Sequence, residues 1–257
     1  MLFGTTSPVS AKTSVDQVGG FSYVQHSVQV APKHSRTARA RCPAGTHVLS
    51  GGARATEYRF LRLQGLPFDS EDKRKSPDDG WEARVWNRNN SSVGITVSAV
   101  CSRLTPRYVE LKDEWDEIGA SEMRCRNSER ATAGGFATGP GRFKTRDFPS
   151  QQGWIVGGWT SASRAKVIRL SVVCLDSSVT VSGRAGTAPG NELIHRRMGC
   201  DGRDVAIGGG IDVGSTFGAW MIRGQFTEPD QFHFLVEKFS RSDGPYTAYV
   251  VCHRRIR

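Results

Sequence analysis

Apolar and polar residues alternate with a period of two along much of this chain. Residues 81–86 read Trp-Glu-Ala-Arg-Val-Trp, a pattern typical of a half-buried β-strand. Short runs of β-branched residues at 95–100 and 168–173 each end near a cysteine. Similar strand-like segments precede the first cysteine of each pair, at 27–30, 108–111 and 178–181. No amphipathic helix of convincing length interrupts them, so the pattern predicts an all-β fold.

One short motif occurs three times, each time between the two cysteines of a pair. It contains glycines soon after the first cysteine, then an aromatic residue, then a β-branched run that ends at the second cysteine. The three copies are Cys42…Gly51-Gly52…Gly80-Trp81…Cys101, Cys125…Gly134-Gly135…Gly153-Trp154…Cys174, and Cys200…Gly208-Gly209-Gly210…Phe232…Cys252. The paired cysteines are 59, 49 and 52 residues apart. A period of about 75–80 residues is longer than that of helical-hairpin arrays or propeller blades.

We therefore predict three pseudo-repeated antiparallel β modules. Glycines inside a strand mark a bulge or a close backbone approach. Their recurrence predicts that the modules meet there, around a pseudo-threefold axis in a prism-like arrangement. The expected organisation is an irregular N-terminal arm at 1–25 and modules at 26–103, 104–176 and 177–257, all within one compact domain.

The repeat also predicts one disulfide in each module: Cys42–Cys101, Cys125–Cys174 and Cys200–Cys252. Six cysteines allow 15 pairings, and only this one treats the modules alike; the alternative is six reduced thiols. Disulfides predict an extracellular or virion location. No secretory signal is visible at the start of the chain, and no segment is long enough to span a bilayer.

The chain is basic, with a formal net charge of +10, and a positive field favours polyanionic partners. The candidate contacts to neighbouring subunits or to an anionic polymer are Lys33, Arg36, Arg39, Arg41, Arg254, Arg255 and Arg257. Alternatively, these are solvated edge charges that prevent strand pairing between molecules. No motif of sequence-specific nucleic-acid recognition is present.

Tryptophans supply the candidate ligand-binding residues. Trp81 and Trp154 occupy matching places in the repeat, which predicts buried anchors. Trp86 and Trp159 follow five residues later, and an odd offset places them on the opposite face of a strand. With Asn87 and Arg88, they form a candidate surface for sugars or a partner protein. The alternative is that both faces are buried between sheets.

Sequence motifs of enzymes, metal sites and cofactor sites are missing, so no catalytic residue, metal or cofactor is predicted. The densest acidic segment is residues 113–117. On a strand, Glu114 and Asp116 would share one side, while Asp113, Trp115 and Glu117 face the other. Paired carboxylates there would suit a hard cation or glycoside hydrolysis. The alternative is a solvent-facing strand whose charges balance nearby arginines.

The motif Cys-Pro-Ala-Gly (42–45) with Gly51-Gly52, Gly80-Trp81 and Val-Ser-Ala-Val-Cys (97–101) resembles a disulfide-bracketed β module. Such modules occur in secreted actinobacterial proteins and in some phage tail or fibre-like proteins. The second copy lacks Pro-Ala-Gly, and the third has Gln231-Phe232 in place of Gly-Trp. The resemblance implies the fold and brings no catalytic residues with it.

These observations favour a non-enzymatic structural or attachment protein exposed outside the cell, as a tail- or capsid-associated virion component. Its expected partners are neighbouring protein subunits, a cell-surface glycan or an anionic polymer. The second hypothesis is a secreted carbohydrate- or cell-surface-binding module that uses Trp86 and Trp159. The third is a glycoside hydrolase that uses Glu114 and Asp116.

Overall fold

A computed structural model describes residues 11–57, 61–70, 77–115, 118–138, 142–160, 166–176, 178–213 and 220–256. In these ranges the chain forms 19 β-strands and the turns between them. They contain no helix that is long and apolar enough to cross a membrane. The all-β prediction is confirmed.

Each module contributes six strands in sequence order. Module 1 has β2 (Phe21–Val30), β3 (Ser35–Arg41), β4 (His47–Ala55), β5 (Leu61–Phe68), β6 (Gly80–Asn87) and β7 (Val93–Ser102). Module 2 has β8 (Arg107–Trp115), β9 (Ile118–Arg124), β10 (Glu129–Thr138), β11 (Arg142–Pro149), β12 (Gly153–Thr160) and β13 (Lys166–Asp176). Module 3 has β14 (Val179–Ala188), β15 (Leu193–Gly199), β16 (Val205–Asp212), β17 (Trp220–Glu228), β18 (Gln231–Lys238) and β19 (Gly244–His253).

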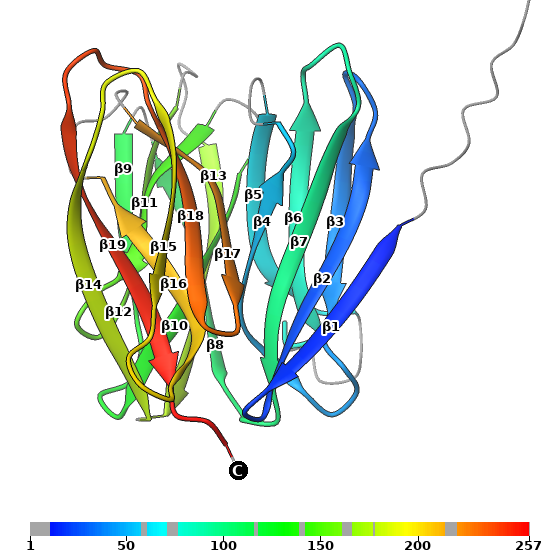
Figure 1. Cartoon of the computed structure of the whole chain (residues 1–257), viewed down its shortest axis with the longest axis vertical. Coiled ribbons are helices and arrows are strands. Elements are labelled where there is room, and N and C mark those ends of the chain that lie inside the picture. Colours follow the sequence, from blue (N-terminus) through cyan, green and yellow to red (C-terminus); the bar gives the residue numbers. More distant parts are fainter. Residues whose placement is uncertain are drawn as a thin grey trace, which may run out of the picture.

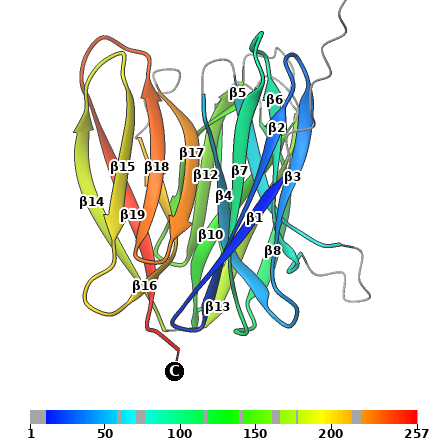
Figure 2. The same cartoon turned by 45° about the vertical axis from the view of Figure 1, so that its right-hand side comes forward.

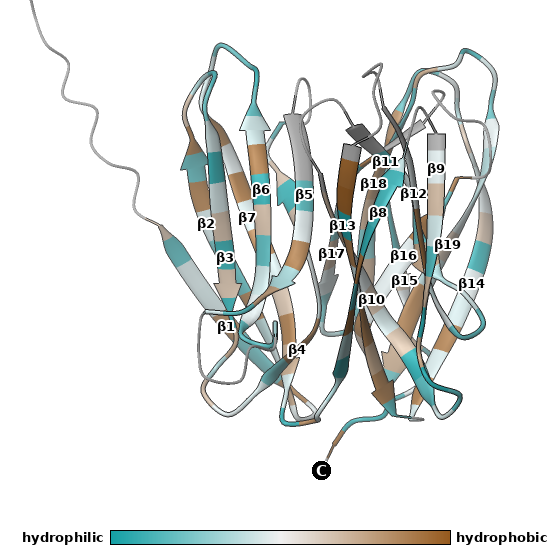
Figure 3. Cartoon of the chain, turned by 180° about the vertical axis from the view of Figure 1, so that it is seen from behind, coloured by the Kyte–Doolittle hydropathy of each residue, from teal (hydrophilic) through white to brown (hydrophobic). Residues whose placement is uncertain are grey.

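Strand pairing is the same in all three modules. The first strand pairs with the sixth and the sixth with the third; the second pairs with the fifth and the fifth with the fourth. Two three-stranded antiparallel layers thus pack face to face over an apolar core in each module. In Figure 3 the central strand β13 is largely hydrophobic, whereas its edge neighbour β8 is mainly hydrophilic.

The modules are joined by strand pairing rather than by a linker. The third strand of one module pairs with the fourth strand of another: β4 with β17, β10 with β5, and β16 with β11. Each of the three sheets is therefore shared by two modules, and the strands run together along the long axis of the molecule (Figures 1 and 2). This closed arrangement confirms the pseudo-threefold prism.

Glycines recur at the same places in the three modules because a side chain there would collide with its neighbours. A Cβ on Gly51, Gly134 or Gly209 would overlap the aromatic ring of Trp81, Trp154 or Phe232, respectively. Trp81 and Trp154 are fully buried, as predicted. The next glycines meet a neighbouring module, since a Cβ on Gly52 or Gly210 would overlap the backbone of β17 or β11. The prediction that the modules meet at these glycines is confirmed.

A β-bulge precedes the glycines in each module. The ladder shifts register at Leu49, Thr132 and Ile207, which occupy equivalent places. The buried Thr132 hydroxyl donates to the Leu49 carbonyl of the neighbouring module at 2.6 Å. The bulges therefore place β4, β10 and β16, the third strand of each module, against one another near the axis.

Each disulfide joins the two layers of one module. Cys42 follows β3 and is bonded to Cys101 in β7. The bonds Cys125–Cys174 and Cys200–Cys252 occupy the equivalent places. The predicted pairing is confirmed, and it is consistent with an extracellular or virion protein.

The N-terminal region differs from the irregular arm expected over residues 1–25. A strand, β1 (Lys12–Val18), pairs with β2, and β2 begins at Phe21 rather than near residue 26. Gly19 and Gly20 have φ values of 56° and 82°, which suit the tight turn of a two-residue hairpin. The C-terminal tail packs on this turn, because the Ile256 amide donates to the Gly19 carbonyl at 2.8 Å.

Candidate functional site: an arginine and tryptophan surface

Pairing of β3 with β6 brings together two of the segments selected from the sequence. Ser35 lies opposite Trp86, Thr37 opposite Arg84, and Arg39 opposite Glu82. These residues share the outer face of the sheet, because Ala38, Ala40, Ala83 and Val85 of the same strands are buried on the inner face. Trp86 is half-buried on the face opposite Trp81, as its odd offset predicted.

Guanidinium groups lie over aromatic rings on this outer face. Arg84 lies 4.8 Å from the centre of the Trp86 ring. Arg39 and Arg41 lie 4.9 and 5.3 Å from the centre of the Phe68 ring. Such contacts orient the cation while leaving its N–H donors available.

Only part of this positive charge is neutralised within the chain. Arg39 forms an ion pair with Glu82 at 3.0 Å. In the part of the chain that the structure describes, Arg41 and Arg84 have no carboxylate within ion-pairing distance. Both side chains are exposed, so both are available to an anionic ligand.

A groove of 370 Å³ continues from Arg84 across the junction of modules 1 and 2. Its walls include Leu66, Glu82 and Arg84 from module 1 and Val167 and Arg169 from module 2. Val167 is 53% exposed and adds apolar surface to the groove, while Arg169 forms an ion pair with Glu110 at 3.4 Å. We call Arg39, Arg41, Arg84, Trp86 and Arg169 together the arginine–tryptophan surface.

Comparisons with known proteins do not assign this surface. No protein-family profile matches the chain, and no curated protein matches its sequence. Among solved structures it is similar to a chain from "The Triple Jelly Roll Fold and Turret Assembly in an Archaeal Virus". The sequence identity is 8%, the match covers 97% of this chain and 90% of that chain, and the TM-score is 0.20. A TM-score this low supports no argument about fold or function, so both rest on the residues themselves.

Asn87 does not belong to the surface, contrary to the sequence-based prediction. It is 1% exposed, and its amide nitrogen donates to the carbonyls of Val30, Ala31 and Ser91. Its side-chain oxygen accepts from the Asn89 amide at 2.9 Å. Period-two alternation places Asn87 on the inner face with Val85, where it fixes the loop after β6.

The remaining basic residues predicted to contact a partner lie either near this surface or at the C-terminus. Lys33 donates to the carbonyl of Arg88 at 2.6 Å, so these exposed residues lie together at one end of the surface. Arg36 donates to the Gln29 carbonyl at 2.8 Å. Trp159 lies in β12, but its side chain is outside the described residues, so its predicted role stays a prediction.

The C-terminal arginines lie against another sheet. Arg255 packs on the β1–β2 turn, since a Cβ on Gly19 would contact its side chain. Arg254 is exposed beside it, and Arg257 lies outside the described residues. The structure therefore does not join this cluster to the arginine–tryptophan surface.

Acidic residues of β8 are placed as period-two alternation predicts. Asp113 accepts hydrogen bonds from Ser121 and from the Trp115 indole, on one side of the strand. The Ser121 hydrogen bond is the main cause that lowers the pKa of Asp113. Glu114 is exposed on the other side. Asp116 and Glu117 lie outside the described residues, so the proposed carboxylate pair stays a prediction.

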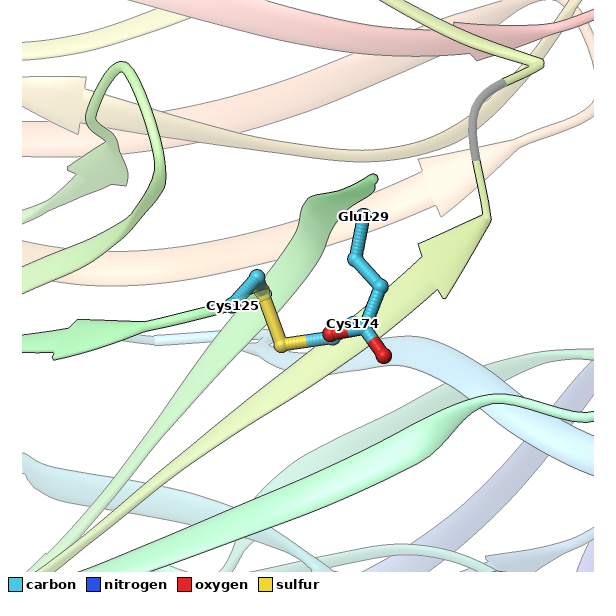
Figure 4. A group of neighbouring side chains, drawn as sticks. All are labelled: Cys125, Glu129 and Cys174. Atoms are coloured by element: carbon cyan, nitrogen blue, oxygen red, sulfur yellow. A yellow bond between two sulfur atoms is a disulfide. The ribbon is translucent and has the colours of Figure 1, made fainter. Parts of the chain in front are cut away.

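One close group has the residue types of a metal site: Cys125, Glu129 and Cys174 (Figure 4). Its members are instead engaged in a disulfide and an ion pair. The two cysteines are joined to each other as a disulfide. Glu129 accepts from Arg107 at 3.0 Å and from the Arg126 amide at 2.8 Å, and the Arg107 hydrogen bond is the main cause that lowers its pKa. This group fastens the start of β10 to β8 beside the disulfide.

Sequence reasoning missed two polar clusters that form only through long-range pairing. Lys144 contacts Asp147 and donates to the Gln225 side-chain oxygen at 2.9 Å, which links modules 2 and 3. His233 lies 3.1 Å from His195 and 3.2 Å from Glu228. The Lys144–Gln225 and His195–His233 contacts join residues that are 81 and 38 positions apart, so the sequence held no signal for them.

Proposed function

We propose that this protein is a non-enzymatic attachment component that acts outside the cell as part of a virion. In this proposal the arginine–tryptophan surface binds an anionic glycan or polymer at the cell surface. The observation that carries the proposal is the pair of exposed guanidinium groups without a carboxylate partner, Arg41 and Arg84, which lie over aromatic rings on one face of the sheet.

The chemistry of the surface suits an acidic polymer better than a neutral one. Arg41 and Arg84 present planar donors to carboxylate or phosphate groups. The Trp86 ring and the exposed Val167 offer apolar surface to sugar rings or other chain atoms. Because Arg41 and Arg84 lie on the same outer face of paired strands, successive acidic groups of one polymer can bind both.

Three further features support an attachment role. The disulfides and shared sheets give a rigid scaffold with a sizeable apolar core. Disulfides are typical of proteins outside the cell. The resemblance of the first module to phage tail or fibre-like modules is the reason to place the protein on a particle.

Binding assays with defined polymers test the surface. We expect wild type to bind a teichoic acid, whose phosphodiester groups are anionic, and polygalacturonate, and to bind neutral dextran much more weakly. The variant Arg84→Ala/Trp86→Ala should lose about tenfold in affinity for the acidic polymers, a change of about 1.4 kcal/mol. Arg203→Ala, an exposed arginine in the turn after Cys200, is the matched control and should bind like wild type. Equal loss in both variants would refute the assignment.

Mass spectrometry of purified particles from the producing culture separates the virion from the secreted-module hypothesis. Detection of the chain in particles at constant stoichiometry supports the virion proposal. Recovery only from the particle-free supernatant, with polymer binding retained, would favour a secreted cell-surface-binding module.

A further inference from the structure

A small cavity lies where the three modules meet. It has a volume of 40 Å³ and is lined by residues of all three modules, among them Gly65, Trp81, Gly134, Lys144, Arg223 and Gln225. About 10–15 Å³ is enough for one water molecule, so the cavity has room for a small ligand.

Two buried N–H donors at this cavity have no acceptor. Trp81 is 2% exposed and Gln225 is 8% exposed. Neither the Trp81 Nε1 nor the Gln225 Nε2 has a hydrogen-bond partner among the described residues. The Gln225 oxygen accepts from Lys144 at 2.9 Å, which fixes the amide so that its nitrogen is the free atom. A buried donor without a partner costs about 1–3 kcal/mol.

Two cationic side chains line the cavity, and each has an ion-pair partner outside it. Lys144 and Arg223 line it, and the described lining residues include no carboxylate. Their ion-pair partners, Asp147 and Glu237, lie outside the lining. Because two cations and two free N–H groups line the cavity, and no carboxylate among the described lining residues does, an anion that accepts hydrogen bonds fits it better than a cation.

Module 2 has a side-chain acceptor for its buried indole at the place where module 1 has a glycine. Gly65, Asp147 and Gln225 occupy equivalent places, because each lies opposite the residue two positions after the module's buried aromatic. In module 2 the Asp147 carboxylate accepts from the Trp154 indole at 2.6 Å. In module 1 the equivalent residue is glycine, and the Trp81 Nε1 lies 2.6 Å from where a Gly65 Cβ would be.

We propose that this cavity binds a small monovalent anion of the chloride class. The anion accepts from the Trp81 Nε1 and the Gln225 Nε2, and it lies close to the Lys144 ammonium. The anion thus accepts a hydrogen bond from the Trp81 indole, as the Asp147 carboxylate does from the Trp154 indole. The bound ion completes a polar chain that connects all three modules, so it acts as a structural ligand of the assembled prism.

Crystals of wild type grown with bromide in place of chloride test the site directly. We expect an anomalous difference peak within hydrogen-bonding distance of the Trp81 Nε1 and the Gln225 Nε2. A cavity that is empty or holds only water, with no anomalous signal, would overturn the proposal. This measurement does not depend on any variant being able to fold.

Thermal unfolding in chloride or bromide, against gluconate at the same ionic strength, tests binding in solution. When halide exceeds its dissociation constant a hundredfold, we expect wild type to unfold about 5 °C higher than in gluconate. Trp81→Phe removes the donor and should lose this difference. Trp154→Phe, whose donor already has an acceptor, is the matched control and should keep it. A halide response that persists in Trp81→Phe would contradict the assignment, and a bromide peak without any shift in wild type would mean binding at crystal concentration only.

Discussion

Removing one disulfide should destabilise the protein by an amount set by the length of its loop. Cys125 and Cys174 are 49 residues apart, and both are buried, so Cys125→Ala/Cys174→Ala removes the crosslink without adding a buried polar group. In the chain-entropy model, a loop of this length contributes about 4 kcal/mol. For 257 residues, an unfolding entropy of about 2.1 cal/mol/K per residue converts this loss into a fall of about 7–8 °C in Tm.

The other two disulfides provide the internal comparison. Their separations are 59 and 52 residues, so the same model predicts losses that agree within about 0.2 kcal/mol. The three loops do not overlap in sequence, so removing all of them should cost about 12 kcal/mol, similar to the whole stability of a typical domain of about 5–15 kcal/mol. We expect the fully reduced chain to be unfolded or nearly so.

Differential scanning calorimetry of the three double variants, with peptide mapping under non-reducing conditions, tests this reasoning. We expect one unfolding transition in each variant, because every sheet contains strands of two modules. A separate transition for the altered module would show that the modules unfold independently. A loss below about 1 kcal/mol for one pair, or any crosslink between modules, would refute the equivalence.

Three further predictions concern single residues. Gly134→Ala should prevent folding or cost several degrees in Tm, because its Cβ would overlap the Trp154 indole. A Cβ on Gly199 would meet only the Asp230 carbonyl oxygen, at 3.3 Å, so Gly199→Ala should cost much less; equal stability of the two variants by thermal melting would contradict this account. Asp147→Asn should cost about 3–5 kcal/mol in urea unfolding, because it leaves the Lys144 ammonium unpaired beside the buried Trp154 donor; a loss below 1 kcal/mol would argue against this charge pair. Burial lowers the pKa of His233 below its usual 6.5 more than Glu228 raises it, with His195 and Arg54 also lowering it. Since the unfolded chain then binds the proton more readily, stability should fall as pH drops through about 6.5, and His233→Gln should flatten that slope in pH-dependent melts.

Features that the repeat duplicates could be predicted from the sequence, and features formed by pairing between modules could not. The disulfides, the buried aromatic residues such as Trp81 and Trp154, and the glycines where modules meet each recur at equivalent places in the three modules. The choice of β17 as the partner of β4 left none, because strand pairing between modules depends on backbone hydrogen bonds that most side chains tolerate. The strand β1 was missed for a related reason: its side chains are almost all exposed, so burial imposes no pattern on them. Asn87 was predicted as a ligand-binding residue, although its alternation with Val85 already indicated the inner face of the sheet.

Differences between the modules are concentrated where a ligand or partner could use them. Trp86 corresponds to Trp159 in module 2 and to Glu237 in module 3, while Arg84 corresponds to Gly157 and Leu235. At these equivalent places, arginine and tryptophan occur together in module 1 alone, although the scaffold that carries them is built three times. One chain then presents a single arginine–tryptophan surface, and two stacked guanidinium groups exposed to water contribute only about 0.5–1 kcal/mol each. Firm attachment to a polymer would then require several copies of the chain acting together, because linked sites raise the effective concentration of the next contact. A particle that displays many copies supplies such linkage, which a single secreted chain would lack.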